Sequence, residues 1–264
     1  MSTDERSIAW YNQNAENYTN HVRNPDDSIY HSLYEKPAMY GLLPDLTSKA
    51  VLSLGCGSGE DCNYLRQQGA SRTVGIDISE GLVGIAKKSY PECEFQVMDM
   101  EHLAFDDSSF DFTYSSLAIH YIEDWRQVFA ETYRVLKPNS YFLFSCNHPV
   151  YSAMEVVKDD GDTRVRELSR TRTKHDDSVK VVGDYMSRKA LIEDGADTMA
   201  VTTWHKSLGE ISAEATGAGF MIANLVEPRP LSKMKEPSPT NYETLTRIPY
   251  FVIFRLWKPA EVTS

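Results

Sequence analysis

The sequence predicts an α/β fold in which helices cover both faces of a parallel sheet. From residue 51 onward, short β-branched or aromatic runs alternate with segments of helical length, which is typical of βαβ units. A glycine-rich turn, Gly55-Cys-Gly57-Ser-Gly59, follows the first run directly and precedes a helical segment. The runs expected to form strands are 51–54, 73–76, 94–97, 110–115, 141–146, 221–226 and 250–257.

Composition and charge restrict the class of protein. The 264 residues are 41 % apolar and 25 % charged, as in ordinary globular domains. The four cysteines are scattered without metal-ligand spacing, so we expect neither a disulfide framework nor a metal site. The polar start and the absence of a long apolar run predict a cytoplasmic protein with no membrane partner. A net charge of −11 disfavours nucleic acid as a partner. A monomer and a homodimer are both compatible with these properties.

Local signals place the helices. Segments 60–68 and 80–88 fill the gaps between the first three strands. Asp124 is a suitable N-cap for a helix with apolar residues at three- and four-residue spacing, which Lys137 and Pro138 end. Ser207, with Glu210 three residues later, predicts a capping box. Gly219 suits the left-handed position after that helix.

The alternation also predicts how the chain is divided. Tyr11, Ala15 and Tyr18 fall on one helical face of an N-terminal extension, and Pro37 begins or kinks a second helix there. A long charged segment separates the fifth strand from the capping-box helix, and a connection of that length is usually functional. We expect one structural domain with four parts: a helical cap (1–48), a core (49–146), an inserted lid (147–204) and the remainder of the core (205–264).

The glycine-rich turn and two acids indicate a nucleoside-containing ligand. Glycines allow close approach of a ligand, and the helix start offers free N–H groups. Glu60 stands where a dinucleotide fingerprint has glycine, which disfavours a pyrophosphate and hence a nicotinamide oxidoreductase. Asp77 ends the second strand, where ribose hydroxyls are held, although it could instead cap the next helix. Asp99 follows the third strand and is suited to accept a hydrogen bond from an exocyclic amine.

Five ordered motifs together resemble class I S-adenosylmethionine-dependent methyltransferases of the small-molecule branch. They are VLSLGCGSG, the acid of GIDIS, the acid of VMDMEHLAF, FDFTYSSLAIHY and RVLKPNSYFLFS, and the resemblance extends from about residue 8 to the end. It implies a Rossmann-like, mostly parallel seven-stranded sheet whose last strand is antiparallel, and S-adenosyl-L-methionine as cofactor with S-adenosyl-L-homocysteine as product. The implied cofactor contacts are Gly55, Cys56 and Gly57 at the methionine portion, Asp77 at the ribose, Ile78, Asp99 and Met100 at the adenine, Ser116 and Leu117 below, and Tyr11 and Tyr18 as a cap. Related motifs usually carry an acid at the position of Ser53, which lowers the expected cofactor affinity.

The acceptor should lie beyond the carboxyl ends of the strands. His120, His148, Tyr151 and His205 fall at this edge and are the candidate acceptor contacts. A histidine near neutral pKa suits a general base, and we place that role on His205 in preference to His120. The alternative for each histidine is a structural or positioning role.

The inserted lid carries basic residues at even positions, like one face of a strand. They form either a solvated face or a contact with an anionic substrate group. The signature of base-amino methylation is missing after the fourth strand, so we expect methyl transfer to an O or N atom of a small molecule. A non-methylating S-adenosylmethionine enzyme and a cofactor-binding sensor are the alternatives. The basic residues are Arg164, Arg166, Arg170, Arg172 and Lys174.

Overall fold

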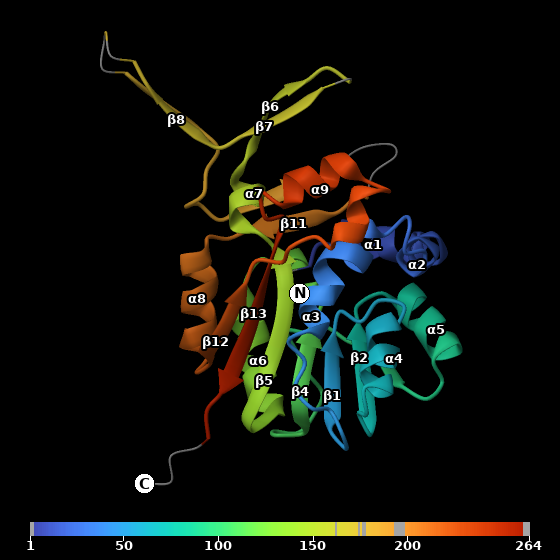
Figure 1. The fold of residues 1–264 in the computed structure, drawn as a ribbon. Helices are drawn as coiled ribbons and strands as arrows, with labels where there is room; N and C mark the ends of the chain where they lie inside the picture. The colour runs from blue at the N-terminus through green and yellow to red at the C-terminus, as the bar shows by residue number, and fades with distance from the viewer. Residues whose placement is uncertain (1–2, 162, 174, 176–177, 193–198, 261–264) are drawn as a thin grey trace.

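A seven-stranded sheet forms the centre of the molecule (Figure 1). The computed structural model describes all residues except 1–2, 162, 174, 176–177, 193–198 and 261–264. The strand order is β12-β13-β5-β4-β1-β2-β3, and β13 runs antiparallel to both of its neighbours. The seven predicted strands and the antiparallel last strand are therefore confirmed. Their bounds are β1 Ala50–Leu54, β2 Arg72–Asp77, β3 Glu94–Val97, β4 Phe110–Ser115, β5 Leu136–Asn147, β12 Met221–Val226 and β13 Phe251–Lys258.

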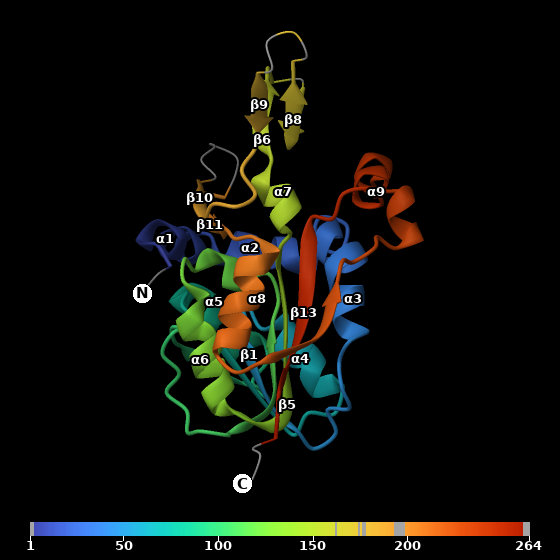
Figure 2. The same cartoon turned by 90° about the vertical axis from the view of Figure 1, so that its left-hand side faces the viewer.

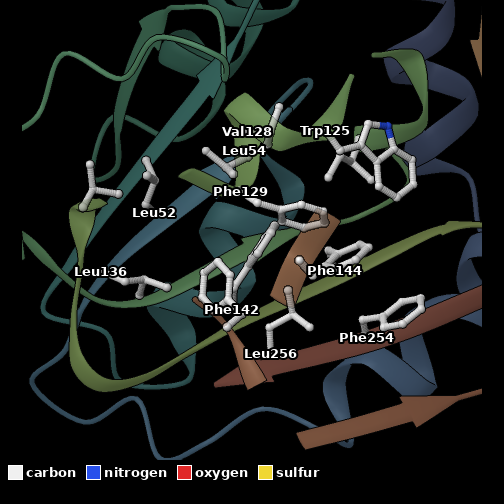
Figure 3. Packing of buried hydrophobic residues seen from close by; sticks show 14 of the residues in the cluster. Leu52, Leu54, Trp125, Val128, Phe129, Leu136, Phe142, Phe144, Phe254 and Leu256 are labelled. Atoms are coloured by element: carbon white, nitrogen blue, oxygen red, sulfur yellow. The ribbon is translucent and has the colours of Figure 1, made fainter. Parts of the chain in front are cut away.

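Helices cover both faces of this sheet, as the alternating pattern predicts. One face carries α3 (Lys36–Tyr40), α4 (Glu60–Gln67) and α5 (Glu80–Ser89), and the other carries α6 (Trp125–Val135) and α8 (Leu208–Gly217). The larger hydrophobic core lies between the sheet and the helices α6 and α8 (Figure 3). Its aromatic residues are fully buried, which stabilises the fold by about 1.5–3 kcal/mol for each such side chain.

The helix ends follow the predicted signals. The Asp124 side chain accepts a hydrogen bond from the Arg126 N–H at the start of α6. Ser207 caps α8 by accepting from the Glu210 N–H at 3.2 Å, and Gly219 has a φ of 100°. The strand β5 starts earlier than predicted, because Leu136 already pairs with Phe110 directly after α6.

The N-terminal extension is helical, as predicted. It contains α1 (Glu5–Gln13), α2 (Ala15–Arg23), η1 (His31–Glu35) and then α3. The element η1 is one π-helical turn, and Pro37 stands in the first turn of α3. A π-helical turn widens the helix locally and is frequent at functional sites.

The insertion forms α7 (Pro149–Ala153) and three antiparallel pairs of strands. Two of these pairs project away from the body of the molecule (Figure 2) and carry the basic residues Arg164–Arg172, whereas Lys174 lies outside the described residues. The third pair returns the chain to the sheet edge, next to the short 3₁₀ turn η2 (Ile119–Tyr121). The strands are β6 (Glu155–Asp159), β7 (Arg164–Glu167), β8 (Ser169–Arg172), β9 (Val179–Val182), β10 (Lys189–Ile192) and β11 (Thr202–His205). After β12 the chain forms η3 (Ser232–Lys235) and α9 (Pro239–Leu245).

Candidate active site

The glycine turn between β1 and α4 has one crowded and one open position. Gly55 and Gly57 have φ values of 64° and 54°, a region that favours glycine. A Cβ on Gly55 would lie 2.3 Å from the Ala118 Cβ, so packing alone requires a glycine there. A Cβ on Gly57 would meet only a Tyr18 ring carbon, at 4.0 Å. The turn therefore keeps free space over Gly57 that a ligand could fill.

Asp77 ends β2 beside this turn. Its Oδ2 accepts from the Gly57 N–H at 2.8 Å, and its Oδ1 accepts from the Ser79 N–H at 2.9 Å. Burial raises the pKa of the Asp77 carboxyl, and the two backbone donors oppose that rise. Ser79 caps α5 by accepting from the Leu82 N–H. Asp77 thus orders both loops, and each of its oxygens retains a lone pair for a further donor.

Asp99, after β3, has one oxygen without a partner. Its Oδ1 accepts from the Glu101 N–H at 2.9 Å. Its Oδ2 is buried and has no hydrogen-bond partner within the described part of the chain. An unpaired buried carboxylate oxygen is unfavourable, so this atom is poised to accept from a ligand donor.

Two tyrosines of the N-terminal helices close this edge of the sheet. The Tyr11 and Tyr121 hydroxyls are 2.6 Å apart, and the Tyr11 and Tyr18 rings meet edge to face with centroids at 5.1 Å. Burial raises the pKa of both Tyr11 and Tyr18, so both hydroxyls stay protonated. The side chain of Asn12 accepts from Ser79 and from the Gly81 N–H, which fastens α1 to α5.

These groups line one cavity, here called the central pocket. Ten of the eleven predicted cofactor contacts line it, and the exception is Cys56, whose thiol is buried against Cys62. Sequence reasoning missed the apolar members Ile8, Leu82, Met98 and Ile122, because their helical or loop positions carry no local motif. The central pocket is lined by Thr3, Ser7, Ile8, Tyr11, Tyr18, Gly55, Gly57, Asp77, Ile78, Leu82, Met98, Asp99, Met100, Ser116, Leu117, Ala118, Tyr121 and Ile122.

A second cavity on the other side of the glycine turn, the loop pocket, contains a buried ion pair. Lys36 pairs with Asp61 and donates to the Ser116 hydroxyl at 2.8 Å, and Tyr40 donates to Asp61 at 3.0 Å. Burial alone would lower the pKa of Lys36, but the Asp61 carboxylate raises it. The loop pocket shares Tyr18, Gly55, Gly57 and Ser116 with the central pocket and adds Val22, Pro25, His31, Ser32, Lys36, Tyr40, Cys56, Ser58, Glu60 and Asp61.

Beneath the loop pocket lies a second buried carboxylate. Glu35 is fully buried, and its Oε1 accepts from the Ser145 hydroxyl at 2.5 Å and the Ser116 hydroxyl at 3.0 Å. Burial raises the pKa of Glu35. The π-helical turn η1 ends at Glu35 and is followed directly by Lys36, so this one segment places both charged groups under the glycine turn.

A third cavity, the histidine pocket, opens beside the central pocket. It shares Tyr11, Tyr18, Leu117 and Tyr121 with the central pocket. Leu117 has a φ of 49°, which is strained for a leucine, and it lies where the two cavities meet. The remaining lining residues are His21, His31, His120, Asn147, Met199, Val201, Thr203 and Phe251.

Of the four predicted acceptor contacts, the structure brings His120 to this pocket. His205 is fully buried, with Nδ1 hydrogen-bonded to the Ser152 hydroxyl at 2.6 Å and Nε2 to the Tyr185 carbonyl at 3.0 Å. Both of its nitrogens are therefore committed to internal bonds.

The other two predicted contacts also have internal partners. His148 caps α7 and contacts Glu227 at 3.1 Å. The Tyr151 ring stacks on Tyr250. His31, which lines two of the cavities, was missed because an isolated histidine in the helical extension has no local signal.

Metal ligands and membrane-spanning helices are both missing among the described residues. In that part of the chain, no three His, Cys, Asp or Glu side chains gather as metal ligands. None of the described helices is both long and apolar enough to cross a membrane.

Comparisons with known proteins identify the fold family. Residues 52–144 match the family described as methyltransferase domain. A solved S-adenosylmethionine-dependent methyltransferase from Mesorhizobium loti superposes with a TM-score of 0.70 at 26 % identity, covering 88 % of this chain and 99 % of that one. The fold is therefore that of class I methyltransferases, a family whose cofactor is S-adenosylmethionine.

Two named relatives each match less than half of the chain. A phthiotriol/phenolphthiotriol dimycocerosates methyltransferase of Mycobacterium tuberculosis is 33 % identical over 129 residues, which are 48 % of each chain. A malonyl-[acyl-carrier protein] O-methyltransferase of Hamiltonella defensa is 34 % identical over 38 % of this chain and 39 % of that one. The matched segment spans half or less of the length of these curated relatives.

Proposed function

We propose that the chain transfers a methyl group from S-adenosylmethionine to an O or N atom of a small-molecule acceptor, because residues 52–144 match a methyltransferase domain and the fold is that of class I methyltransferases. The names of the two relatives refer to a lipid and to a protein-bound acyl group, so they suggest no single acceptor. The cavities of this chain therefore determine which acceptor fits.

The observation that carries the proposal is the unpartnered Oδ2 of Asp99. An adenine amine would supply the donor that this oxygen lacks. Asp77 would accept from ribose hydroxyls on the other side of the same pocket, and Ile78, Leu82 and Met100 offer apolar surface to the purine. The residues present thus fit an adenosine group.

The loop pocket suits the amino-acid end of the same molecule. The open position at Gly57 leads from the central pocket to the Lys36–Asp61 pair. An ammonium and a carboxylate that already face each other are complementary to a zwitterion, because each can pair with one end of it. We assign Lys36 to the cofactor carboxylate and Asp61 to its ammonium group.

The residues of the chain would mainly orient the reactants and exclude water. When bound, S-adenosylmethionine supplies a methyl group activated by a sulfonium, so that an in-line displacement needs correct alignment above all. Tyr11 and Tyr18 cover the central pocket against water, and Leu117 and Tyr121 form the boundary with the histidine pocket. That shared boundary makes the histidine pocket the place for the acceptor.

Calorimetric titration with S-adenosylhomocysteine, together with label transfer from methyl-labelled S-adenosylmethionine to a metabolite pool, tests the proposal. We expect saturable binding and label in a small molecule. Binding without any transfer would favour the sensor alternative, and a lack of binding would refute the proposal.

A further inference from the structure

The histidine pocket has an uncharged lining. None of the described residues that line it is Asp, Glu, Lys or Arg. Its walls are the rings of Tyr11, Tyr18, Tyr121 and Phe251 together with aliphatic side chains. Lys36 and Asp61 line the neighbouring loop pocket, where the proposed function assigns them to the cofactor, and neither lines the histidine pocket.

The two inner histidines of this pocket are neutral at physiological pH. Burial lowers the pKa of His31 to about 4, and the nearby Lys36 contributes. Burial lowers the pKa of His120 to about 3. His21 lies exposed at the rim. A charged molecule that entered would lose hydration and would find no Asp, Glu, Lys or Arg among the described lining residues, which is strongly unfavourable.

The neutral polar atoms provide one donor and one acceptor. Nδ1 of His120 accepts a long hydrogen bond from the Asn147 N–H at 3.4 Å, so its hydrogen resides on Nε2, which can donate. Nδ1 of His31 is buried without a hydrogen-bond partner within the described part of the chain. In the tautomer of His31 that carries the hydrogen on Nε2, this Nδ1 can accept. A hydroxyl group both donates and accepts, and it therefore matches this pair.

We propose that the methyl acceptor is an uncharged molecule with a planar apolar body, whose hydroxyl group is bound between His31 and His120. The inference rests on the proposed function, because it takes the histidine pocket as the acceptor site. It also assigns no substrate contact to the basic residues of the insertion. Arg164 and Arg166 on β7, and Arg170 and Arg172 on β8, lie on the pairs of strands that project away from the body of the molecule (Figure 2), and none of them lines the pocket.

Three phenols that differ in the charge of their para substituent test this assignment. Ligand-observed NMR titrations would compare 4-ethylphenol, 4-hydroxyphenylacetate and tyramine against protein saturated with S-adenosylhomocysteine. These probes share the ring and the hydroxyl, and their tails are neutral, anionic and cationic. We expect the neutral phenol to bind about tenfold more tightly than either charged one. Equal or tighter binding of a charged probe, or no binding of 4-ethylphenol, would overturn the proposal.

Two sets of variants locate the binding. His31→Leu should remove the preference for 4-ethylphenol over 4-ethylanisole, which lacks the hydroxyl donor. His120→Leu should weaken the binding of both ligands, because each oxygen loses its donor, whereas the exposed His102→Leu should leave both affinities unchanged. Met199→Lys places a cation of similar length in the pocket lining and should shift the preference about fivefold towards 4-hydroxyphenylacetate. Met221→Lys on the exposed edge strand β12 is the matched control. A preference that none of the pocket variants alters contradicts the assignment.

The two proposals fail in distinguishable ways. Calorimetry with S-adenosylhomocysteine reads the central pocket, which neither His120 nor Met199 lines. Normal cofactor binding with no discrimination among the phenols would refute the acceptor class and leave the proposed function standing. A failure to bind S-adenosylhomocysteine in the wild-type protein would refute the proposed function itself.

Discussion

Replacing Asp99 with asparagine separates a ligand contact from a structural one. The Oδ1 bond to the Glu101 N–H can be kept by the asparagine carbonyl, so the amide NH₂ takes the place of the unpartnered Oδ2. No hydrogen bond that Asp99 makes to a described residue is lost, and the oxygen without a partner is replaced. We therefore expect the free energy of unfolding to stay unchanged or to rise.

The affinity for the cofactor, unlike the free energy of unfolding, should fall in Asp99→Asn. An amide nitrogen cannot accept from the adenine amine, and a hydrogen bond to a charged group contributes about 1.5–3 kcal/mol. The Kd for S-adenosylhomocysteine, measured by calorimetry, should accordingly rise about 10- to 150-fold in Asp99→Asn. Asp106→Asn, on the exposed loop before β4, is the control and should bind normally.

A ligand with a different purine base distinguishes a hydrogen bond to Asp99 from an effect of Asp99 on the shape of the pocket. S-inosylhomocysteine carries a carbonyl oxygen in place of the adenine amine, so it should bind the wild-type carboxylate poorly and the asparagine amide better. Asp99→Asn should thus reverse the preference between the two ligands. If the variant lost affinity for both ligands equally, Asp99 would act on the shape of the pocket and our account of its Oδ2 would be wrong.

The structure supports four further predictions. Gly57→Ala should fold, since the added Cβ meets open space. Calorimetry should nevertheless show at least tenfold weaker binding of S-adenosylhomocysteine. Normal affinity would mean that no ligand approaches this turn. A short linker in place of 155–182 should leave cofactor binding and label transfer intact. The two flanking ends already meet, because the Asp184 N–H donates to the Ala153 carbonyl at 3.1 Å. Loss of label transfer would show that the projecting strands take part in the reaction. His31 has a pKa of about 4 in the folded protein and the ordinary histidine pKa of 6.5 in the unfolded chain, so between these values only the unfolded state binds the proton. The free energy of unfolding should therefore fall as the pH drops, and His31 alone should contribute a loss of about 2 kcal/mol at pH 5. Urea unfolding at pH 7.5 and 5 would show it, and His31→Leu should reduce the loss. Ser53→Asp should lower stability by about 1–3 kcal/mol in urea unfolding, and Glu35→Gln should suppress that effect.

The sheet and its strand-end acids could be predicted because their signals are local. Strand 72–77 reads as an apolar run that ends in Asp77, and a parallel sheet brings such ends to one edge whatever the rest of the chain does. The glycine turn likewise needs positive φ at Gly55 and Gly57, which the residue type reveals. These positions required no knowledge of distant contacts.

The acceptor side could not be predicted in the same way. The histidine pocket joins residues from η1, η2, the end of β5, β11 and β13, and no local pattern reports that such distant segments meet. The predicted base illustrates this, because His205 lies near the expected edge in sequence but bonds Ser152 and Tyr185. The even spacing of Arg164 and Arg166 indicated a strand, but the direction of a projecting pair of strands depends on how its base packs against α7.

The charged side chains around position 53 explain why a serine, and not an aspartate, stands there. Side chains alternate along β1, so Ser53 points to the same face as Val51, whose cluster includes Met39 of α3 and Tyr114 of β4. Glu35 and Asp61 already bring two carboxylates to this face, and the ammonium of Lys36 lies beside them.

An aspartate at 53 would add a carboxylate to the buried compartment that holds Glu35, Asp61 and Lys36. Like charges at close range disfavour ionisation and lower stability, so a neutral hydroxyl is the better partner there. Negative charge thus reaches this side of the glycine turn from the helical elements and not from β1. If Ser53→Asp alone lowered stability as much as it does in combination with Glu35→Gln, the two side chains would not share this compartment and the argument would fail.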